Sequence, residues 1–281
     1  MEKFSVSKTL VNIVIFFLLF LFGDLFSSLI FDLLFSIVKL PSSEFYVILR
    51  TSGCLLLTLL FFWLYTTKGL HLKMSDFRIN FAIKKWGILF AVLLPAFIVF
   101  VFLLVGRTEV TSFTFSNIIL IVIASMITAL KAGILEEILF RGFIMRLLEN
   151  RWNKYIAILI PSFVFSLAHL PSMETFTIAS IILLIISGTL VGTMFSLVTY
   201  KGNSVANSIL MHTLWNFVII TSVLHITTEQ GTYGDPIFSI IIPSNNILLT
   251  GAGFGVEASL IAIIGYACIC VITFSGGIER C

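Results

Sequence analysis

Two adjacent carboxylates stand in an otherwise apolar stretch of this sequence, and an arginine follows them. Glu136 and Glu137 precede Arg141. On a helix, Glu137 and Arg141 occupy positions i and i+4 in the favourable order for an ion pair, whereas Glu136 points about 100° away. Such a helix neutralises one carboxylate and leaves its neighbour free to act as a general base. In the alternative interpretation, both glutamates face cytosolic water beside Arg146 and Glu149.

Two histidines lie in similar apolar surroundings farther along the chain. His169 ends the short run that begins at Phe165, just before Pro171. A lone histidine of this kind is commonly a hydrogen-bonded packing residue. His212 and Asn216 are four residues apart, so both side chains lie on one face of a helix. Packing explains this pair less readily, although an interhelical hydrogen bond is its simplest structural interpretation.

The composition indicates where these residues must be placed. Hydrophobic types make up 59% of the 281 residues and Phe alone accounts for 29. Charged residues make up 11%, whereas a soluble domain usually has about 25%. This composition excludes a disordered chain, a fibre, a nucleic-acid-binding protein and a water-soluble enzyme. It predicts a polytopic membrane protein.

Eight stretches are apolar enough to span a bilayer, for which about 20 residues are needed. They cover residues 10–33, 44–66, 86–105, 116–140, 155–170, 176–199, 204–226 and 256–275. A backbone in lipid must satisfy its own hydrogen bonds, so each span is expected to be a helix. The predicted fold is therefore all-α, with residues 1–281 forming one transmembrane domain and no separate soluble domain.

The basic residues predict the orientation of these spans. Twelve Lys and Arg residues fall on one side: Lys3, Lys8, Lys68, Lys73, Arg78, Lys84, Lys85, Arg146, Arg151, Lys154, Lys201 and Arg280. Only three fall on the other side: Lys39, Arg50 and Arg107. Because positive charge gathers on the cytoplasmic side, both termini are predicted to be cytoplasmic.

The candidate residues also fall at similar depths. From the turn near residues 150–153, Glu136 and His169 each lie about 22–25 Å along their helices. From the turn at residues 201–203, His212 lies about 15 Å and Asn216 about 20 Å along the seventh span. Three helices are therefore expected to bring their rarest polar residues to one level of the membrane.

Other notable residues receive no catalytic role from the sequence. The four cysteines lack metal-ligand spacing with a histidine and are interpreted as packing residues. Gly188 and Gly192 form a GxxxG step, which predicts a close helix–helix contact. The polar stretch 227–255 is interpreted as an external loop. Four ionisable residues in or beside spans remain unassigned: Asp24, Asp32, His225 and Glu257.

Three motifs, in this order on three spans, resemble those of one protein family. They are the Glu-Glu-x-x-x-Arg of residues 136–141, the Phe-x-x-x-His of residues 165–169 and the His-x-x-x-Asn of residues 212–216. Together they resemble the CPBP (ABI, or type II CAAX prenyl endopeptidase) intramembrane proteases. The resemblance covers roughly residues 116–225, the expected catalytic core, and the eight-span layout suits the remainder.

The resemblance implies a peptidase mechanism and assigns a role to each matching residue. Glu136 and His169 would activate a water for attack on a peptide carbonyl. His212 and Asn216 would polarise that carbonyl and stabilise the oxyanion. The supporting residues would be Glu137 and Arg141, which position the substrate, and Phe165, which forms part of the cavity wall.

The resemblance leaves the need for a metal open. A mechanism without a cofactor, in which the glutamate and histidine act as the base, is favoured here. The alternative is a hydrolytic Zn²⁺ site with an open position for water. Its ligands would be Glu136, His169 and His212.

The expected setting is a multi-pass protein of a cell membrane, of the bacterial plasma membrane type. Its partners would be the lipid bilayer and a peptide or membrane-protein substrate, with no nucleic acid. The resemblance implies processes such as bacteriocin immunity, peptide maturation or surface-protein control; CAAX processing would need a host that prenylates proteins.

Two other classes of function compete with a protease. The first is a non-catalytic scaffold or immunity protein that binds a peptide or partner in the same cavity; the intact set of four polar residues argues against it. The second is a proton-coupled transporter that uses the glutamate pair as a relay. Such a transporter is expected to show repeats or helices broken by Gly or Pro in matching halves, and neither is evident in the sequence.

Overall fold

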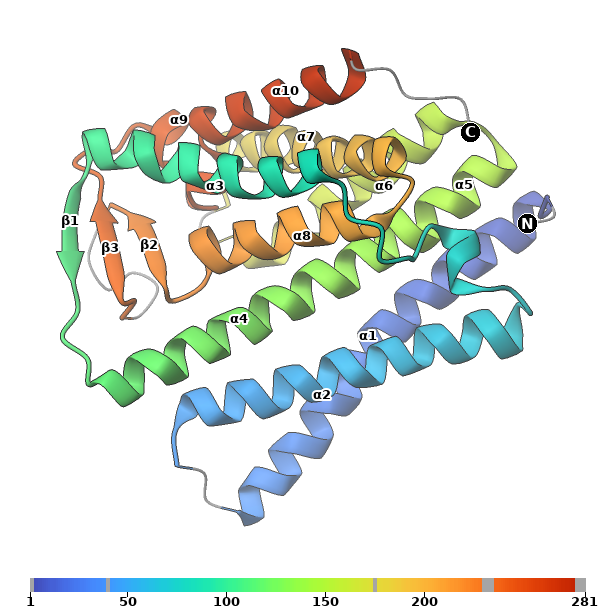
Figure 1. Ribbon diagram of the computed structural model, residues 1–281, viewed down its shortest axis with the longest axis horizontal. Helices are drawn as coiled ribbons and strands as arrows, with labels where there is room; N and C mark the ends of the chain where they lie inside the picture. Colours follow the sequence, from blue (N-terminus) through green and yellow to red (C-terminus); the bar gives the residue numbers. More distant parts are fainter. Residues whose placement is uncertain (1–2, 39–40, 174–175, 229–234, 276–281) are drawn as a thin grey trace.

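A computed structural model describes residues 3–38, 41–173, 176–228 and 235–275 of the chain. Helices dominate it and lie side by side as a bundle (Figure 1). The longest are α1 (Val6–Ile37), α2 (Ser43–Leu64), α3 (Lys85–Val105), α4 (Phe115–Glu137) and α7 (Ile178–Gly202). The shorter ones are α5 (Met145–Arg151), α6 (Lys154–Ala168), α8 (Val205–Trp215), α9 (Ile247–Thr250) and α10 (Leu260–Ser275).

The predicted all-α polytopic fold is confirmed, and each of the eight apolar stretches contains a helix. Among the described residues, six helical segments are long and apolar enough to cross a membrane. Two shorter apolar helices, Val205–Ile220 and Leu260–Ser275, correspond to the seventh and eighth stretches. The predicted bounds of these last two were wrong at one end. The seventh helix ends at Ile220 rather than at 226, and a separate 3-10 turn, Val256–Ala258, precedes α10.

Side-chain caps explain where the central helices begin and end. Thr177 and Ser180 form a reciprocal capping box at the start of α7, which satisfies backbone N–H groups that have no partner within the helix. Asn203 adopts a left-handed conformation with φ 48° and ends α7. Ser204 then caps α8 by accepting a hydrogen bond from the Ala206 N–H. The turn between α7 and α8 is therefore only two residues long.

Three π-helical segments interrupt the regular α-helical geometry. They are Tyr65–Gly69 after α2, Ile138–Ile144 between α4 and α5, and Asn216–Ile220 after α8. The second begins directly after Glu137, and the third begins at Asn216. A π turn is usually a single insertion in a helix and is frequent at functional sites, so its position beside two of the predicted motifs is notable.

A small sheet joins the connections at one end of the bundle, which the sequence did not predict. Strands β1 (Arg107–Val110), β2 (Leu224–Thr227) and β3 (Phe238–Ile241) lie in the order β1-β3-β2. Strand β3 pairs antiparallel with β1 and parallel with β2. The sheet therefore ties the chain after α3 to the chain after α8 (Figure 1).

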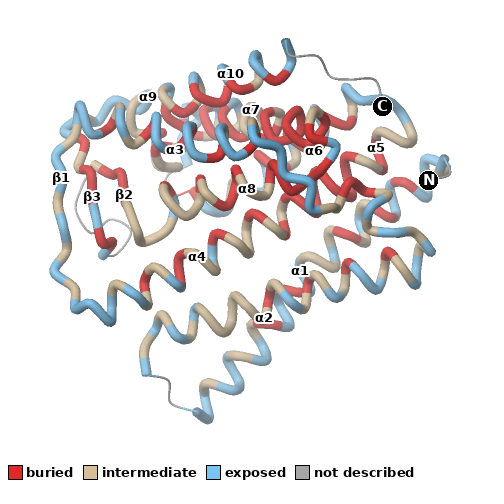
Figure 2. Tube along the Cα trace, viewed as in Figure 1, coloured by how far each residue is buried: buried red, intermediate tan, exposed pale blue. Residues whose placement is uncertain are grey.

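The buried residues concentrate on the inner helices (Figure 2). One hydrophobic cluster joins α1, α2, α5 and α6 around the stacked rings of Phe16 and Phe143, whose centroids are 3.8 Å apart. A second cluster joins α3, α7, α8, α10 and the sheet, with Trp215 against Tyr266. Along α1 and α2, by contrast, most of the trace is exposed or intermediate.

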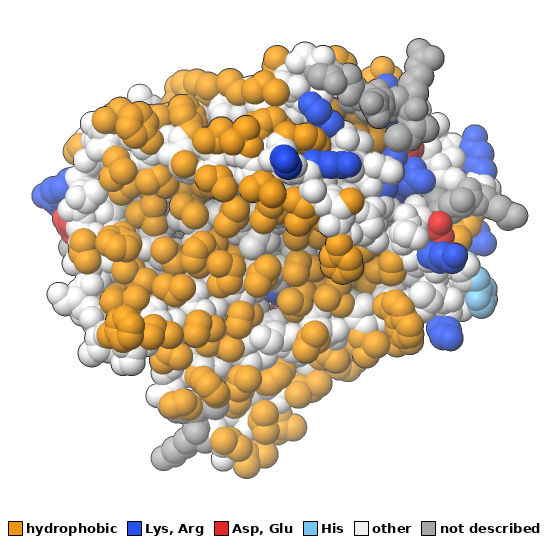
Figure 3. All heavy atoms as spheres, viewed as in Figure 1, with side chains coloured by type: hydrophobic (Ala, Val, Ile, Leu, Met, Phe, Trp, Pro, Cys, Tyr) orange, Lys and Arg blue, Asp and Glu red, His pale blue; other side chains and the backbone are white. Residues whose placement is uncertain are grey.

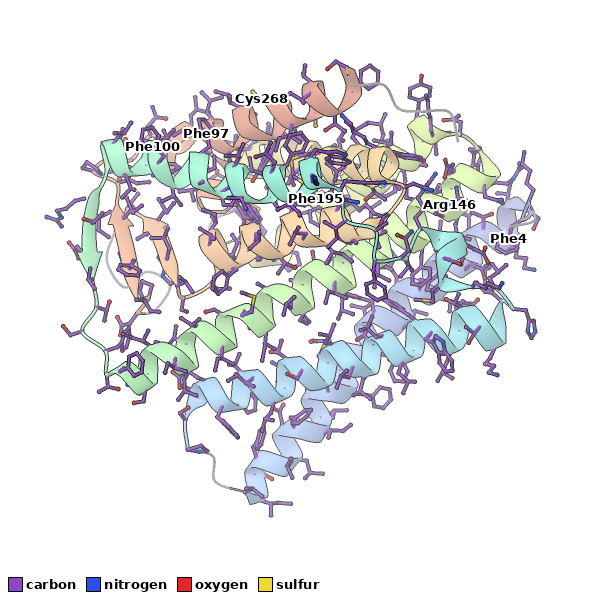
Figure 4. All side chains as sticks on the ribbon, in the orientation of Figure 1. Phe4, Phe97, Phe100, Arg146, Phe195 and Cys268 are labelled. Atoms are coloured by element: carbon purple, nitrogen blue, oxygen red, sulfur yellow. The ribbon has the colours of Figure 1, made fainter. Side chains whose placement is uncertain are left out.

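The surface has the two parts that a membrane protein requires. Apolar side chains cover the broad middle of the visible face, and Lys and Arg gather mainly at the end where α1 begins and α10 ends (Figure 3). On α3, for example, Phe97 and Phe100 point outward from the bundle (Figure 4) and are 43% and 60% exposed. The chain is therefore a multi-pass membrane protein, while the side on which its termini lie stays a prediction.

Candidate active site

A cavity of about 480 Å³ lies within the bundle. It is lined by side chains from α4, α6, α7, α8, β2 and the segment before α10. Of the seven residues singled out from the sequence, five line it: Glu136, Phe165, His169, His212 and Asn216. Three separate helices thus bring the expected residues to one place, in agreement with their estimated depths.

The other two expected residues, Glu137 and Arg141, form a buried ion pair beside the cavity. The Arg141 Nη1 lies 2.8 Å from the Glu137 Oε1, and both side chains are fully buried. The guanidinium also donates from Nη2 to the Gly192 carbonyl on α7, at 3.2 Å. Its charge lies 4.6 Å from the ring centre of Phe165 and 5.3 Å from that of Phe195, both favourable cation–π distances.

The same Glu137 oxygen holds His212. The His212 Nδ1 lies 2.9 Å from the Glu137 Oε1, and the imidazole stacks on the Phe195 ring at 5.1 Å with an interplanar angle of 13°. Figure 4 shows Phe195 among the helices near the middle of the bundle. With its Nδ1 occupied and its ring stacked, His212 presents its Nε2 to the cavity. Glu137 therefore links Arg141 to His212.

His169 is oriented in a corresponding way by its own helix. Its Nδ1 lies 2.8 Å from the backbone carbonyl of Phe165, one turn earlier. A carbonyl can only accept, so Nδ1 carries the proton and Nε2 is left as an acceptor. The ring also contacts Phe165 at 4.5 Å and Phe254 at 6.2 Å between centroids. Both histidines thus have Nδ1 engaged and Nε2 available.

Glu136 is the free carboxylate of the pair. Its side chain is 21% exposed, whereas that of Glu137 is fully buried. Its Oε2 lies 3.9 Å from the His212 Nε2, which is beyond hydrogen-bond distance. Within the described residues this oxygen has no hydrogen-bond partner. As predicted, one glutamate is paired with arginine and the other has a free carboxylate oxygen.

Small residues allow the helices that carry these groups to approach closely. A Cβ added to Gly192 would lie 2.8 Å from the Ser162 Cα, and one added to Gly188 would lie 2.9 Å from the Ser166 Cβ. The close contact predicted for the GxxxG step is therefore present, between α7 and α6. Gly133, one turn before Glu136, makes a similar approach to α8, because its Cβ would lie 3.0 Å from the Thr213 nitrogen.

Two of the unassigned residues, His225 and Glu257, also line the cavity. Both were expected at the ends of spans. His225 instead lies on β2, and Glu257 lies on the 3-10 turn before α10. Burial lowers the pKa of His225, so its neutral form predominates at neutral pH. The available signal for Glu257 was a lone carboxylate after the glycine-rich run of residues 251–255.

Asp24 and Asp32 lie elsewhere, among α1, α2 and α4. Asp24 received no role from the sequence, and its Oδ1 lies 3.8 Å from the Lys131 Nζ on α4. The hydroxyl of Tyr46 donates to Asp32. Neither aspartate is among the residues that line the cavity.

The fit of a metal ion to these residues can be tested by their arrangement. In the described part of the chain, no three His, Cys, Asp or Glu side chains are gathered closely enough to hold one ion. The zinc ligand set considered from the sequence does not form such a group among the described residues, and the choice between a metal-independent and a zinc mechanism stays a prediction.

Comparison with known proteins gives one match. Residues 92–218 match the model of a family described as type II CAAX prenyl endopeptidase Rce1-like. This region contains α4, α5, α6, α7 and α8, and thus all seven residues singled out from the sequence. No curated protein matches the chain. No solved structure matches it.

Proposed function

We propose that this chain is an intramembrane endopeptidase whose active site is the cavity lined by Glu136, His169, His212 and Asn216. Its match over residues 92–218 to the model of the type II CAAX prenyl endopeptidase Rce1-like family supports the proposal. The observation that carries the proposal is the convergence of these four side chains, from three helices, on one cavity. The family supplies the class of reaction, and the geometry supports a role for each residue.

Glu136 is the proposed general base, with His169 beside it. Its uncompensated Oε2 can accept a proton from a water that attacks the carbonyl carbon of the peptide bond. The His169 Nε2, a hydrogen-bond acceptor in the observed orientation, can hold the second proton of the same water. When the C–N bond breaks, Glu136 returns its proton to the departing amine, which balances the reaction.

His212 and Asn216 are proposed to stabilise the oxyanion. The Asn216 amide is a donor in every protonation state. His212 can donate from Nε2 only when both ring nitrogens carry protons. Glu137 and Glu136 on either side of the ring supply the negative charge that this form needs. Donors held in place before the reaction stabilise developing charge effectively in an enclosed site.

Glu137 and Arg141 are proposed as positioning residues that fix His212. The guanidinium is bound to Glu137, to the Gly192 carbonyl and between aromatic rings, so it anchors α4 to α7. Glu137 then holds the imidazole on α8. One buried ion pair thereby sets the relative positions of three helices around the cavity.

The proposal is tested by cleavage of a quenched-fluorescent peptide library with the purified protein in detergent. Glu136→Gln keeps the size of the side chain but removes the base, so it should lower kcat/KM by about 100-fold or more. The matched control is Glu44→Gln on α2, which removes a carboxylate that does not line the cavity. A strong zinc chelator, added to each protein, tests the metal-independent mechanism.

Each outcome has a definite meaning. Full activity of Glu136→Gln would contradict the assigned base. Loss of wild-type activity on chelation, restored by Zn²⁺, would contradict the metal-independent mechanism. If the wild-type protein cleaved no peptide of the library but still bound peptides, the non-catalytic scaffold would be favoured instead.

The proposed orientation places both termini on the cytoplasmic side of a bacterial plasma membrane. The gathering of Lys and Arg at one end of the bundle supports it. A reporter fused after Lys201 should be found inside the cell. Its appearance outside would contradict the proposed orientation. Processing of peptides or membrane proteins, including a role in bacteriocin immunity, is the biological setting that we propose.

A further inference from the structure

Glu257 is held in the cavity wall by two aromatic residues. Its carboxylate lies beside the Trp215 side chain, which favours the charged form, and its backbone carbonyl accepts a hydrogen bond from the Tyr266 hydroxyl at 3.1 Å. The two rings also pack against each other, with centroids 5.4 Å apart. Trp215 directly precedes Asn216, so the contact joins Glu257 to the helix that carries His212. Glu257 thus contacts Trp215 through its side chain and Tyr266 through its backbone.

The segment before Glu257 has a backbone that directs it toward the active site. Gly251, Ala252, Gly253 and Gly255 all have positive φ, between 53° and 99°. A Cβ on Gly251 would lie 1.7 Å from the Gly255 carbonyl oxygen, so the turn needs glycine there. Phe254, at its tip, lines the cavity and contacts His169. This segment forms the wall that faces the predicted catalytic groups.

The described residues around the cavity give Glu257 no lysine or arginine partner, and the two active-site histidines are the basic groups near it. The carboxylate interacts favourably with His169 and His212 and unfavourably with Glu136. No Lys or Arg is among the described residues that line the cavity. The nearby Arg141 is fully buried and bound to Glu137. His225 is kept neutral by burial, so it adds no positive charge at neutral pH.

Burial raises the pKa of Glu257, because a carboxylate enclosed by protein loses its hydration. A cationic group brought beside it would oppose that effect and form a charge-assisted hydrogen bond, which is stronger than a neutral one. An anionic group would meet two carboxylates and no lysine or arginine. The cavity therefore discriminates between ligands by charge.

We propose that Glu257 is a specificity-determining residue that binds a cationic group of the peptide substrate, a lysine or arginine side chain close to the cleaved bond. The inference rests on the proposed peptidase function and extends it to a class of substrate. It assigns Glu136 and Glu257 different tasks within one cavity. Glu136 acts on water, and Glu257 binds the substrate.

The test compares two quenched-fluorescent peptides that differ at one position. A lysine or its uncharged counterpart norleucine is placed in turn at each of the two positions on either side of the cleaved bond. Wild-type protein should prefer lysine at one of them by about tenfold in kcat/KM, the size expected for one charge-assisted contact. In Glu257→Gln this ratio should fall to about one. Glu44→Gln, which has no contact with the cavity, should keep it.

A binding measurement separates this inference from the peptidase function. The same peptide pair, labelled with a fluorophore, is titrated into Glu136→Gln and into the double variant Glu136→Gln/Glu257→Gln. Preferential binding of the lysine peptide that disappears in the double variant supports the inference even where no cleavage occurs. Equal affinities for the two peptides in Glu136→Gln would overturn it. An equal loss of kcat/KM for both peptides in Glu257→Gln would also overturn it, and would assign Glu257 to positioning His169.

Discussion

Helices α1 and α7 are almost equally apolar, yet protein covers them to very different extents. In the most apolar part of each helix, 17% of the residues are buried on α1 and 50% on α7. Helix α7 carries Gly188, Gly192 and three buried serine residues, whereas the outer face of α1 is mainly Leu, Val and Phe. Hydrophobicity thus identifies a helix as membrane-embedded, while small residues indicate that another helix, rather than lipid, covers it.

The active-site residues follow the same division between inner and outer helices. Glu136, His169, His212 and Asn216 all belong to α4, α6 and α8 or directly follow them, and α7 packs against α6 and α8. Helices α1 and α2 add none of the residues that line the cavity. The two groups of helices should therefore respond differently to substitution.

The largest effect is expected from breaking the buried ion pair of the inner helices. Arg141→Met removes the arginine partner of the fully buried Glu137 and leaves it only its contact with His212, which should lower the free energy of unfolding by about 3–5 kcal/mol. The matched control is Arg107→Met in β1, whose pair with Glu109 is exposed and should contribute less than about 1 kcal/mol. Thermal unfolding in detergent measures both. Equal losses of unfolding free energy in the two variants would contradict the larger contribution expected from the inner, buried ion pair.

The next effect tests an aromatic contact that anchors α1 to the inner helices. Phe16 is fully buried against Phe143, so Phe16→Ala should cost about 3–5 kcal/mol. Phe22, on the same helix, is 43% exposed, and Phe22→Ala should cost far less in the same detergent. If both substitutions were equally mild, α1 would be held by lipid alone and the aromatic cluster would contribute little.

A smaller effect is expected from filling the contact between α6 and α7. In Gly192→Ala the new Cβ meets the Ser162 backbone, so overpacking of about 1–3 kcal/mol should exceed the gain of about 1 kcal/mol in helix propensity. In the control Gly265→Ala on α10, the nearest atom is the flexible end of Leu94, and stability should be maintained. Peptide cleavage should also fall in Gly192→Ala, because Gly192 accepts a hydrogen bond from Arg141. A stable, fully active Gly192→Ala would contradict the tight packing.

The smallest effect is expected on the lipid-facing surface of α1. Leu29 is 57% exposed, and Leu29→Ala should change the unfolding free energy in detergent by less than about 0.5 kcal/mol. The measurement is the midpoint of thermal unfolding beside that of the wild-type protein. A loss comparable with that of Phe16→Ala would reveal a partner surface on α1.

The sequence predicted the helices and the main polar contacts because their signals are local. Spans appear as long apolar runs, and the Glu137–Arg141 pair follows from helical spacing. The sheet could not be predicted in this way, since its four-residue strands pair residues far apart in the sequence, such as Arg107 with Ile241. The linking of His212 to Glu137 was also missed, because it depends on how closely α4 approaches α8. For Glu257, the position within the cavity depends on the turn before it rather than on any span.

The π-helical segments have a consequence for how this chain can vary in length. Removing one residue from Ile138–Ile144 would let the segment relax to an α-helix, but it would rotate one flank by about 100° relative to the other. Arg141 lies within that segment and Glu137 directly precedes it, so a deletion between the two residues would rotate Arg141 away from Glu137. The same reasoning applies to Asn216–Ile220 and the chain that leads to β2. Single-residue deletions are therefore expected to be tolerated in the outer connections and selected against at these two junctions.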